Sequence, residues 1–189
     1  MKFLNTLIAT IFLATPVYAA PQPYELQQGD SSVGFSWFLG SEEVRGSMPV
    51  AGADIVLDLD RLQNSKVRVS VDVAQARAGF PFASQGMKGK KVLWAQKYPQ
   101  ITFESTGFRR SGDGAIVDGN LTVRGVTRPA TFTAQLFRQA GTEVGDRSRL
   151  SVRLNGSLSR AAFGANGWAD MAGDEVRLSI IARMQIAGR

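Results

Sequence analysis

The chain has 189 residues, with 22 Lys and Arg against 16 Asp and Glu, a formal net charge of +6, and neither histidine nor cysteine. The two absences exclude disulfides, Ser-His-Asp and Cys-His nucleophiles, and nearly every zinc or copper site. Side-chain catalysis would rest on carboxylates or a lysine, and no such constellation stands out. We therefore expect a protein that is not an enzyme.

The first 19 residues have the layout of a secretory signal peptide. Lys2 precedes the apolar run 3–14, and Pro16 and the small-residue pattern Val17-Tyr18-Ala19 follow it. The run is short against the roughly 20 residues that span a bilayer. We expect cleavage after Ala19, one domain over residues 20–189, and a periplasmic location, with secretion beyond the periplasm as the alternative.

The rest of the chain alternates apolar and polar residues with a period of two, which is typical of strands with one buried face. The first run places Val33, Phe35, Trp37 and Leu39 on one parity. Further runs follow in chain order over 55–60, 67–73, 103–109, 116–124, 130–136, 150–158 and 176–186. The turn residues Ser111-Gly112-Asp113-Gly114 predict a hairpin between two of them.

Residues 79–99 interrupt this pattern with an excursion that is long and rich in aromatic side chains. Residues 87–94 favour one or two helical turns, which Pro99 would end. Such a loop is typical of a functional lid, although its side chains would equally plug one end of a barrel. Its lysines, at 88, 90, 91 and 97, suit an anionic membrane surface or simply a solvated loop.

Eight or nine strand candidates suit an eight-stranded barrel, whose interior either fills with side chains or holds one small ligand. The inward parity is mostly Val, Leu and Ile, and Gly119 and Ala134 would leave room along the axis. Such an interior suits hydrocarbon, because each buried CH₂ group contributes roughly 0.8 kcal/mol. A solid, dry core is the alternative.

The segment 98–106, followed by Gly119-Asn120-Leu121-Thr122-Val123-Arg124-Gly125-Val126-Thr127-Arg128-Pro129, resembles the signature of the YceI family of polyisoprenoid-binding periplasmic proteins. Weaker likenesses cover 24–26 with 31–35, then 44–47, 158–164 and 173–178, in the family's order. The resemblance implies an all-β, lipocalin-like, extended antiparallel eight-stranded barrel with a short helical insertion between central strands. It also implies an isoprenoid tail, commonly of a quinone, in the interior, and no reaction.

This sequence departs from the family pattern where polar groups are common. Leu39 stands in place of a histidine, Phe80-Pro81-Phe82 in place of an Arg-Asp pair, and Ser159, Ala161 and Ala162 in place of more polar residues. If those groups hold a ligand's head group, part of that contact is missing here. We expect Arg160 to be solvated at the surface, with contact to a polar head group as the alternative, and Asp174 and Glu175 to cap a turn.

We expect a non-catalytic binding protein that encloses an isoprenoid lipid, either a polyprenyl chain or an isoprenoid quinone, for storage or transport. The alternatives are a binder of another amphiphile, such as a fatty acid or its amide, and an interaction module whose 79–99 loop docks a membrane redox partner. We expect no cofactor, metal or nucleic acid. We do expect transient contact with a membrane surface. The sequence leaves the oligomeric state open, and a dimer is one possibility. The expected ligand-binding residues, for which ordinary core packing is the alternative, are Phe35, Trp37, Phe80, Phe82, Met87, Leu93, Trp94, Tyr98, Ile101, Phe103, Phe132, Phe163 and Trp168.

Overall fold

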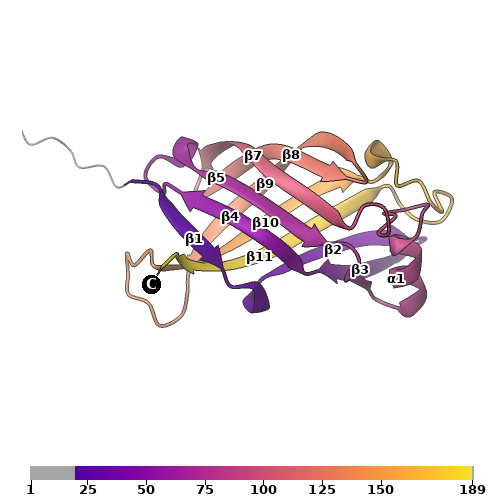
Figure 1. Ribbon diagram of the computed structural model, residues 1–189, viewed down its shortest axis with the longest axis horizontal. Helices are drawn as coiled ribbons and strands as arrows, with labels where there is room; N and C mark the ends of the chain where they lie inside the picture. Colours follow the sequence, from indigo (N-terminus) through magenta and orange to yellow (C-terminus); the bar gives the residue numbers. More distant parts are fainter. Residues whose placement is uncertain (1–19, 189) are drawn as a thin grey trace, which may run out of the picture.

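Residues 20–188 are described by the computed structural model, so the predicted signal peptide lies outside the described residues. Most of the regular secondary structure in the described chain is strand, as the period-two alternation predicts (Figure 1). Its elements are β1 (Gln22–Leu26), η1 (Gln28–Asp30), β2 (Ser32–Leu39), β3 (Glu42–Met48), β4 (Val50–Leu57), η2 (Leu62–Asn64), β5 (Lys66–Asp72), β6 (Arg77–Ala78), α1 (Pro81–Lys88), β7 (Gln100–Ser111), β8 (Gly114–Val123), β9 (Val126–Arg138), β10 (Arg149–Ser159), η3 (Ala161–Phe163) and β11 (Glu175–Ile186).

The sheet closes on itself as an antiparallel barrel of eight strands. The order is β1-β4-β5-β7-β8-β9-β10-β11, and β11 returns to β1. Closure rests on short ladders, because β1 contributes three paired residues to β11 and three to β4, whereas β10 and β11 share eleven pairs. The predicted fold class, including the short helical insertion, is confirmed.

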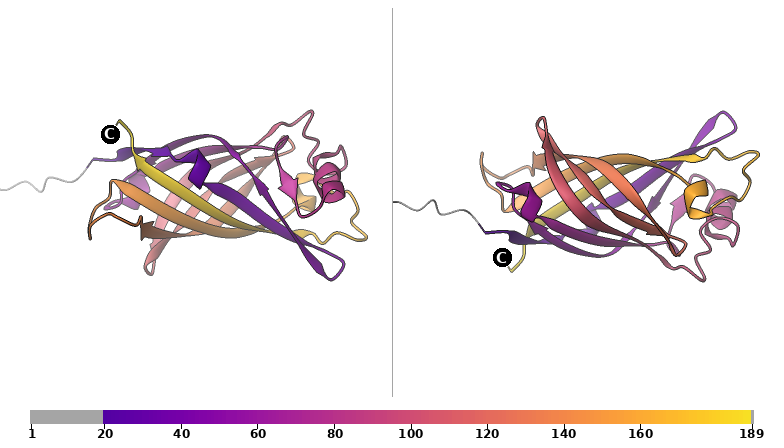
Figure 2. Two further views of the ribbon diagram at one scale, coloured as in Figure 1. Left: turned by 90° about the horizontal axis from the view of Figure 1, so that it is seen from below. Right: turned by 90° about the horizontal axis from the view of Figure 1, so that it is seen from above.

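The β2–β3 hairpin extends the barrel beyond this ring. β2 pairs with residues 177–181 of β11, on the same edge that β1 uses further along, and β3 then pairs with β2 and β6. Figures 1 and 2 show the hairpin running toward the end of the barrel that carries α1. We call this the α1 end, and the opposite end, where β1 begins and the chain terminates, the β1 end.

Side chains alternate across the wall as predicted. On β11, Leu178 and Met184 face the interior, and Arg177 and Arg183 face solvent. The predicted hairpin is also present, since β7 and β8 pair through Ser111 and Gly114 around Gly112, whose φ of 53° suits glycine.

The helical turns lie earlier than predicted. We expected them over residues 87–94, but α1 begins at Pro81 and ends at Lys88. Proline suits the first helical turn because the missing N–H would have no partner there. After Gly89 the chain continues in turns, and Trp94 has a φ of 51°, which an α-helix does not allow. None of the helices in the described part has the length and apolar character needed to cross a bilayer.

Candidate functional site: an apolar cavity through the barrel

The interior of the barrel is an open cavity of about 1090 Å³. Its wall is made by inward-facing Val, Leu, Ile and Phe side chains of the barrel strands, such as Val67, Leu121 and Leu178. Strands as long as β9, with 13 residues, rise roughly 3.3 Å per residue and tilt by about 35–45°, so the barrel is about 30 Å long. The volume lies at the upper end of ordinary ligand pockets. The alternative of a solid, dry core is therefore wrong.

Eleven of the thirteen predicted ligand-binding residues line this cavity, and their contact with a ligand stays a prediction. They are Phe35, Trp37, Phe80, Phe82, Met87, Leu93, Ile101, Phe103, Phe132, Phe163 and Trp168. Trp94 and Tyr98 lie outside the cavity wall. Their rings meet edge-on with centroids 5.8 Å apart, and the Lys97 ammonium lies over both.

Three of the lining phenylalanines lie against the wall, each over a glycine of the neighbouring strand. The rings of Phe35 and Phe103 occupy the space that a side chain at Gly46 or Gly119 would need. In the same way, a Cβ atom at Gly156 would lie 2.8 Å from the Phe132 ring. We expected Gly119 to leave free space along the axis. That is wrong, because the Phe103 ring fills it; each of the three rings instead occupies the space beside a glycine of the neighbouring strand.

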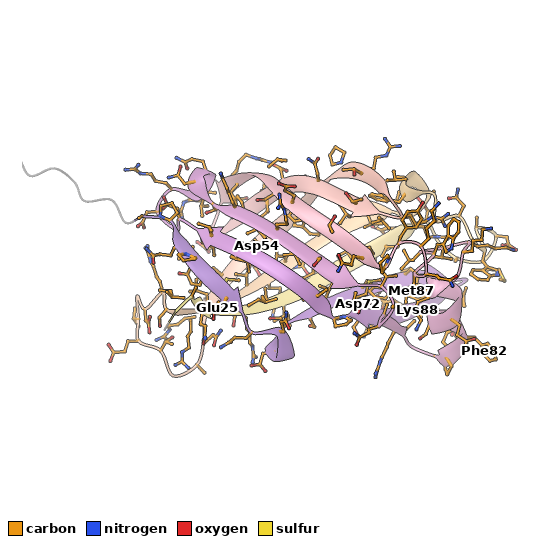
Figure 3. All side chains as sticks on the ribbon, viewed as in Figure 1. Glu25, Asp54, Asp72, Phe82, Met87 and Lys88 are labelled. Atoms are coloured by element: carbon orange, nitrogen blue, oxygen red, sulfur yellow. The ribbon has the colours of Figure 1, made fainter. Side chains whose placement is uncertain are left out.

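The α1 end of the cavity is apolar. Met87 is the buried residue of α1, and it packs in a cluster with Phe35, Val71 and Ala76. Phe82, on the same helix, is 82% exposed and lies at the outer rim of the cavity, at the tip of α1 (Figure 3). The helix therefore covers the cavity with one face and presents an aromatic side chain to solvent with the other.

The β1 end of the cavity carries charge. Arg110, Asp113 and Arg138 line it there, together with an ion pair in which Arg147 Nη2 lies 2.9 Å from Asp60 Oδ1. The hydrogen bond from Arg147 holds the pKa of Asp60 below its ordinary value. Sequence reasoning missed this rim, although Arg138 continues the inward parity of the 130–136 run and was a readable signal.

Nearby, the hydroxyl of Tyr24 on β1 donates a hydrogen bond of 2.8 Å to the Arg147 carbonyl. Tyr24 is 4% exposed, and this burial raises the pKa of its phenol. The bond joins the strand that closes the barrel to the charged rim.

Arg160 is buried, and its predicted exposure at the surface is wrong. Its guanidinium donates hydrogen bonds of 2.6–2.9 Å to four main-chain carbonyls, those of Ala165, Gly167, Ala172 and Gly173. The loop 160–174 wraps around this one side chain because its carbonyls have no strand partner. We call this loop the arginine loop.

The base of the arginine loop is capped as predicted for Asp174. Its carboxylate accepts a hydrogen bond of 2.8 Å from the Ala161 N–H, and a hydrogen bond from the Ser159 side chain is the main cause of its lowered pKa. Glu175 instead pairs with Arg177 at 3.1 Å.

The excursion after α1 is fastened to the barrel by its main chain. Arg124 lies in the two-residue turn between β8 and β9, and both Arg124 and Gly125 have positive φ. Its guanidinium donates to the carbonyls of Lys90 at 2.9 Å and Val92 at 2.6 Å. The Gly167 N–H of the arginine loop donates to the Lys91 carbonyl at 2.8 Å. The two segments that cover the α1 end are therefore joined.

Buried polar side chains within the described residues are accounted for by contacts within the protein. No group of three or more acidic side chains within 20–188 is placed to hold a metal ion. Every buried side-chain polar atom of the same residues has a hydrogen-bond partner. What the arrangement can do is hold an apolar molecule.

An antiparallel eight-stranded barrel around an open apolar cavity defines the lipocalin-like class of binding proteins. Within it, the chain belongs to the YceI family, whose YceI-like domain matches residues 24–184. A UPF0312 protein of Yersinia pestis is 31% identical over 147 residues, which cover 77% of this chain and 72% of the relative. A UPF0312 protein of Serratia proteamaculans is 29% identical, with 78% and 73% covered.

Solved structures share the fold. BcnA of Burkholderia cenocepacia superposes with a TM-score of 0.76 at 20% identity, covering 84% of this chain and 99% of that protein. The YceI protein of Campylobacter jejuni has a TM-score of 0.60 at 20% identity, covering 73% of this chain and 82% of that protein.

Proposed function

We propose that this protein is a non-catalytic carrier or reservoir that encloses the apolar chain of an isoprenoid lipid, such as an isoprenoid quinone, in the periplasm. The observation that carries the proposal is the apolar cavity of about 1090 Å³ that follows the axis of the barrel. Membership of the YceI family supports it. The layout of residues 1–19 as a signal peptide supports the location.

The energetics favour a long hydrocarbon chain. Each CH₂ group taken from water contributes roughly 0.8 kcal/mol, so a chain of about ten buried carbons contributes on the order of 8 kcal/mol before the costs of binding. No charged contact is needed along the chain. A head group would meet either the apolar α1 end or the charged β1 end.

The charged β1 end favours a second candidate, a fatty acid or its amide. Arg110 and Arg147 place two guanidinium groups at this mouth, and a carboxylate head group would be drawn to them. The two candidates predict different extracted lipids.

Native mass spectrometry of protein expressed with residues 1–19 intact, followed by lipid extraction and identification, tests the proposal. We expect a mass increment that organic extraction removes and that proves to be an isoprenoid lipid. A carboxylic lipid would establish the second candidate instead. Protein that is empty after expression, and that takes up no quinone from detergent solution, would refute both.

A further inference from the structure

The exposed apolar side chains of this protein gather at the α1 end. Five of the nine large apolar residues exposed within 20–188 lie there, and the others are scattered over the wall and the β1 end. Phe82 is 82% exposed, Met171 52% and Trp168 44%, with Phe80 and Phe38 close behind. Isolated exposed apolar residues are ordinary, but a contiguous group marks an interaction site.

These residues form one continuous surface. The Trp168 ring packs on Gly86 of α1, where a Cβ atom would lie 3.2 Å from it. The carbonyl of Met171 accepts a hydrogen bond of 2.8 Å from Gly40, at the tip of the β2–β3 hairpin. Helix, arginine loop and hairpin therefore present their exposed side chains together, and Figure 2 shows the three segments at one end of the barrel.

The same surface is the rim of the cavity. The exposed residues Phe80, Phe82, Trp168 and Met171 all line the cavity as well, and we call these four the mouth patch. A molecule that leaves the interior at this end therefore meets a mainly apolar surface, in which Gln85 of α1 and the internally bonded Arg160 are the polar lining residues. The charged rim of the β1 end offers no such path.

Cations without acidic partners lie beside the mouth patch. The segment 73–99 contains five cations, Arg77, Lys88, Lys90, Lys91 and Lys97, and no carboxylate. No ion pair of the described residues involves any of these lysines. Lys90 and Lys97 instead lie over the Trp94 ring, at 5.1 and 4.7 Å. Asp72 lies just before this segment, but its carboxylate accepts hydrogen bonds from Ala74 and Gln75, so it forms no ion pair with these cations.

We propose that the mouth patch docks on the surface of an anionic phospholipid bilayer, with its aromatic side chains among the lipid head groups and the lysines of 73–99 against anionic phosphates. Aromatic and methionine side chains beside unpaired lysines are the combination that binds such surfaces, because apolar burial and charge attraction add. A mixed-charge protein surface would be a poorer complement to a segment with five cations and no acid. The inference deepens the proposed function, because a carrier of a bilayer lipid has to meet the bilayer.

Co-sedimentation with phospholipid vesicles tests the docking. The protein is mixed with vesicles of phosphatidylglycerol and phosphatidylcholine, or of phosphatidylcholine alone, at low and high salt. We expect strong partitioning to the anionic vesicles that salt weakens. Phe82→Ser should weaken it about tenfold, since burial of a phenylalanine is lost. The double variant Lys90→Gln, Lys91→Gln should weaken it about 25-fold, at roughly fivefold for each basic side chain near the anionic surface.

Two matched controls keep the comparison specific to the α1 end. Val144→Ser removes an apolar residue that is 91% exposed near the β1 end. Lys66→Gln with Arg153→Gln removes two exposed cations elsewhere on the barrel. Both should bind as the original protein does. Phe82, Lys90 and Lys91 are exposed, and circular dichroism verifies that every variant is folded.

The proposal is overturned if the variants and controls partition equally, if neutral vesicles bind as strongly as anionic ones, or if the protein ignores lipid vesicles and is captured only by a membrane protein. Lipid content, measured by extraction from each variant, separates this inference from the proposed function. Protein that carries lipid but does not dock refutes the docking alone. Protein that docks but never carries lipid refutes the proposed function alone.

Discussion

The phenylalanine rings that lie over glycines explain how this barrel keeps its interior open. Eight strands enclose a space that side chains readily fill. A large ring that pointed along its strand normal would cross that space. Here the Phe132 ring bends over Gly156 and lies along the wall, and Phe35 and Phe103 do the same over their glycines. The width of the cavity therefore depends on three glycines, Gly46, Gly119 and Gly156, which do not themselves line it.

Replacing Gly156 by alanine should both destabilise the protein and narrow the cavity. The new Cβ would lie 2.8 Å from the Phe132 ring, so the ring has to move inward. Overpacking of this kind costs about 1–3 kcal/mol. Chemical denaturation measures the loss, and the mass of lipid extracted per protein measures the narrowing.

Gly107→Ala is the matched control, because this strand glycine has no atom within 4 Å of a new Cβ. It should leave the lipid content unchanged, and its stability should be unchanged or slightly raised, since alanine restricts the unfolded chain. Equal lipid content in the two variants would contradict the wall-packing account.

At the scale of elements, the arginine loop depends on one side chain. Arg160→Met keeps a similar volume but leaves four carbonyls without their donor. A buried acceptor left unpaired costs about 1–3 kcal/mol. With four such carbonyls, we expect this variant to lower the free energy of unfolding by more than about 3 kcal/mol. Limited proteolysis should cut within 161–174 in this variant. Arg153→Met, which removes an exposed arginine from the preceding strand β10, should leave the loop protected.

How much the sequence could predict differs between strands and loops. The strands were predictable because Leu178 and Arg177, like most pairs on β11, repeat one local rule, apolar inward and polar outward; the exposed Ile181 is an exception. The place of Arg160 was not, because its acceptors are main-chain carbonyls, which leave no mark in the residue pattern. The helix was predicted too late in the chain, because the aromatic and lysine residues of 87–94 are compatible with turns as well as with a helix. The cavity was expected from its lining, but the room that Gly119 was to provide belongs to Phe103.

At the scale of the whole molecule, acid should weaken the fold. The pKa of Asp58 is lowered first by a hydrogen bond from Asn64, and that of Asp118 first by one from Thr131. Since these pKa values lie below the unfolded value near 3.8, the unfolded chain takes up protons first. The stability that the carboxylates contribute is therefore present above this pH and lost as the pH falls below it.

Urea unfolding from neutral pH down to pH about 3 measures this loss. Asp58→Asn should lower the midpoint at neutral pH and flatten its fall in acid. Asp54→Asn, at an exposed position on β4, should do neither. A midpoint that stays constant in acid for the unchanged protein would contradict the account.

The closure of the barrel also sets when the cavity comes into being. Tyr24 of β1 pairs with Ile186 of β11, so the first strand of the ring cannot complete its pairing until the last strand is present. Contacts so distant in the chain are slow to form, because the loop-closure entropy has to be overcome first. Nearly the whole chain must therefore be present before the barrel can close. Until then the apolar faces that form the cavity wall stay exposed, and the cavity can enclose a molecule only after the last strand is in place.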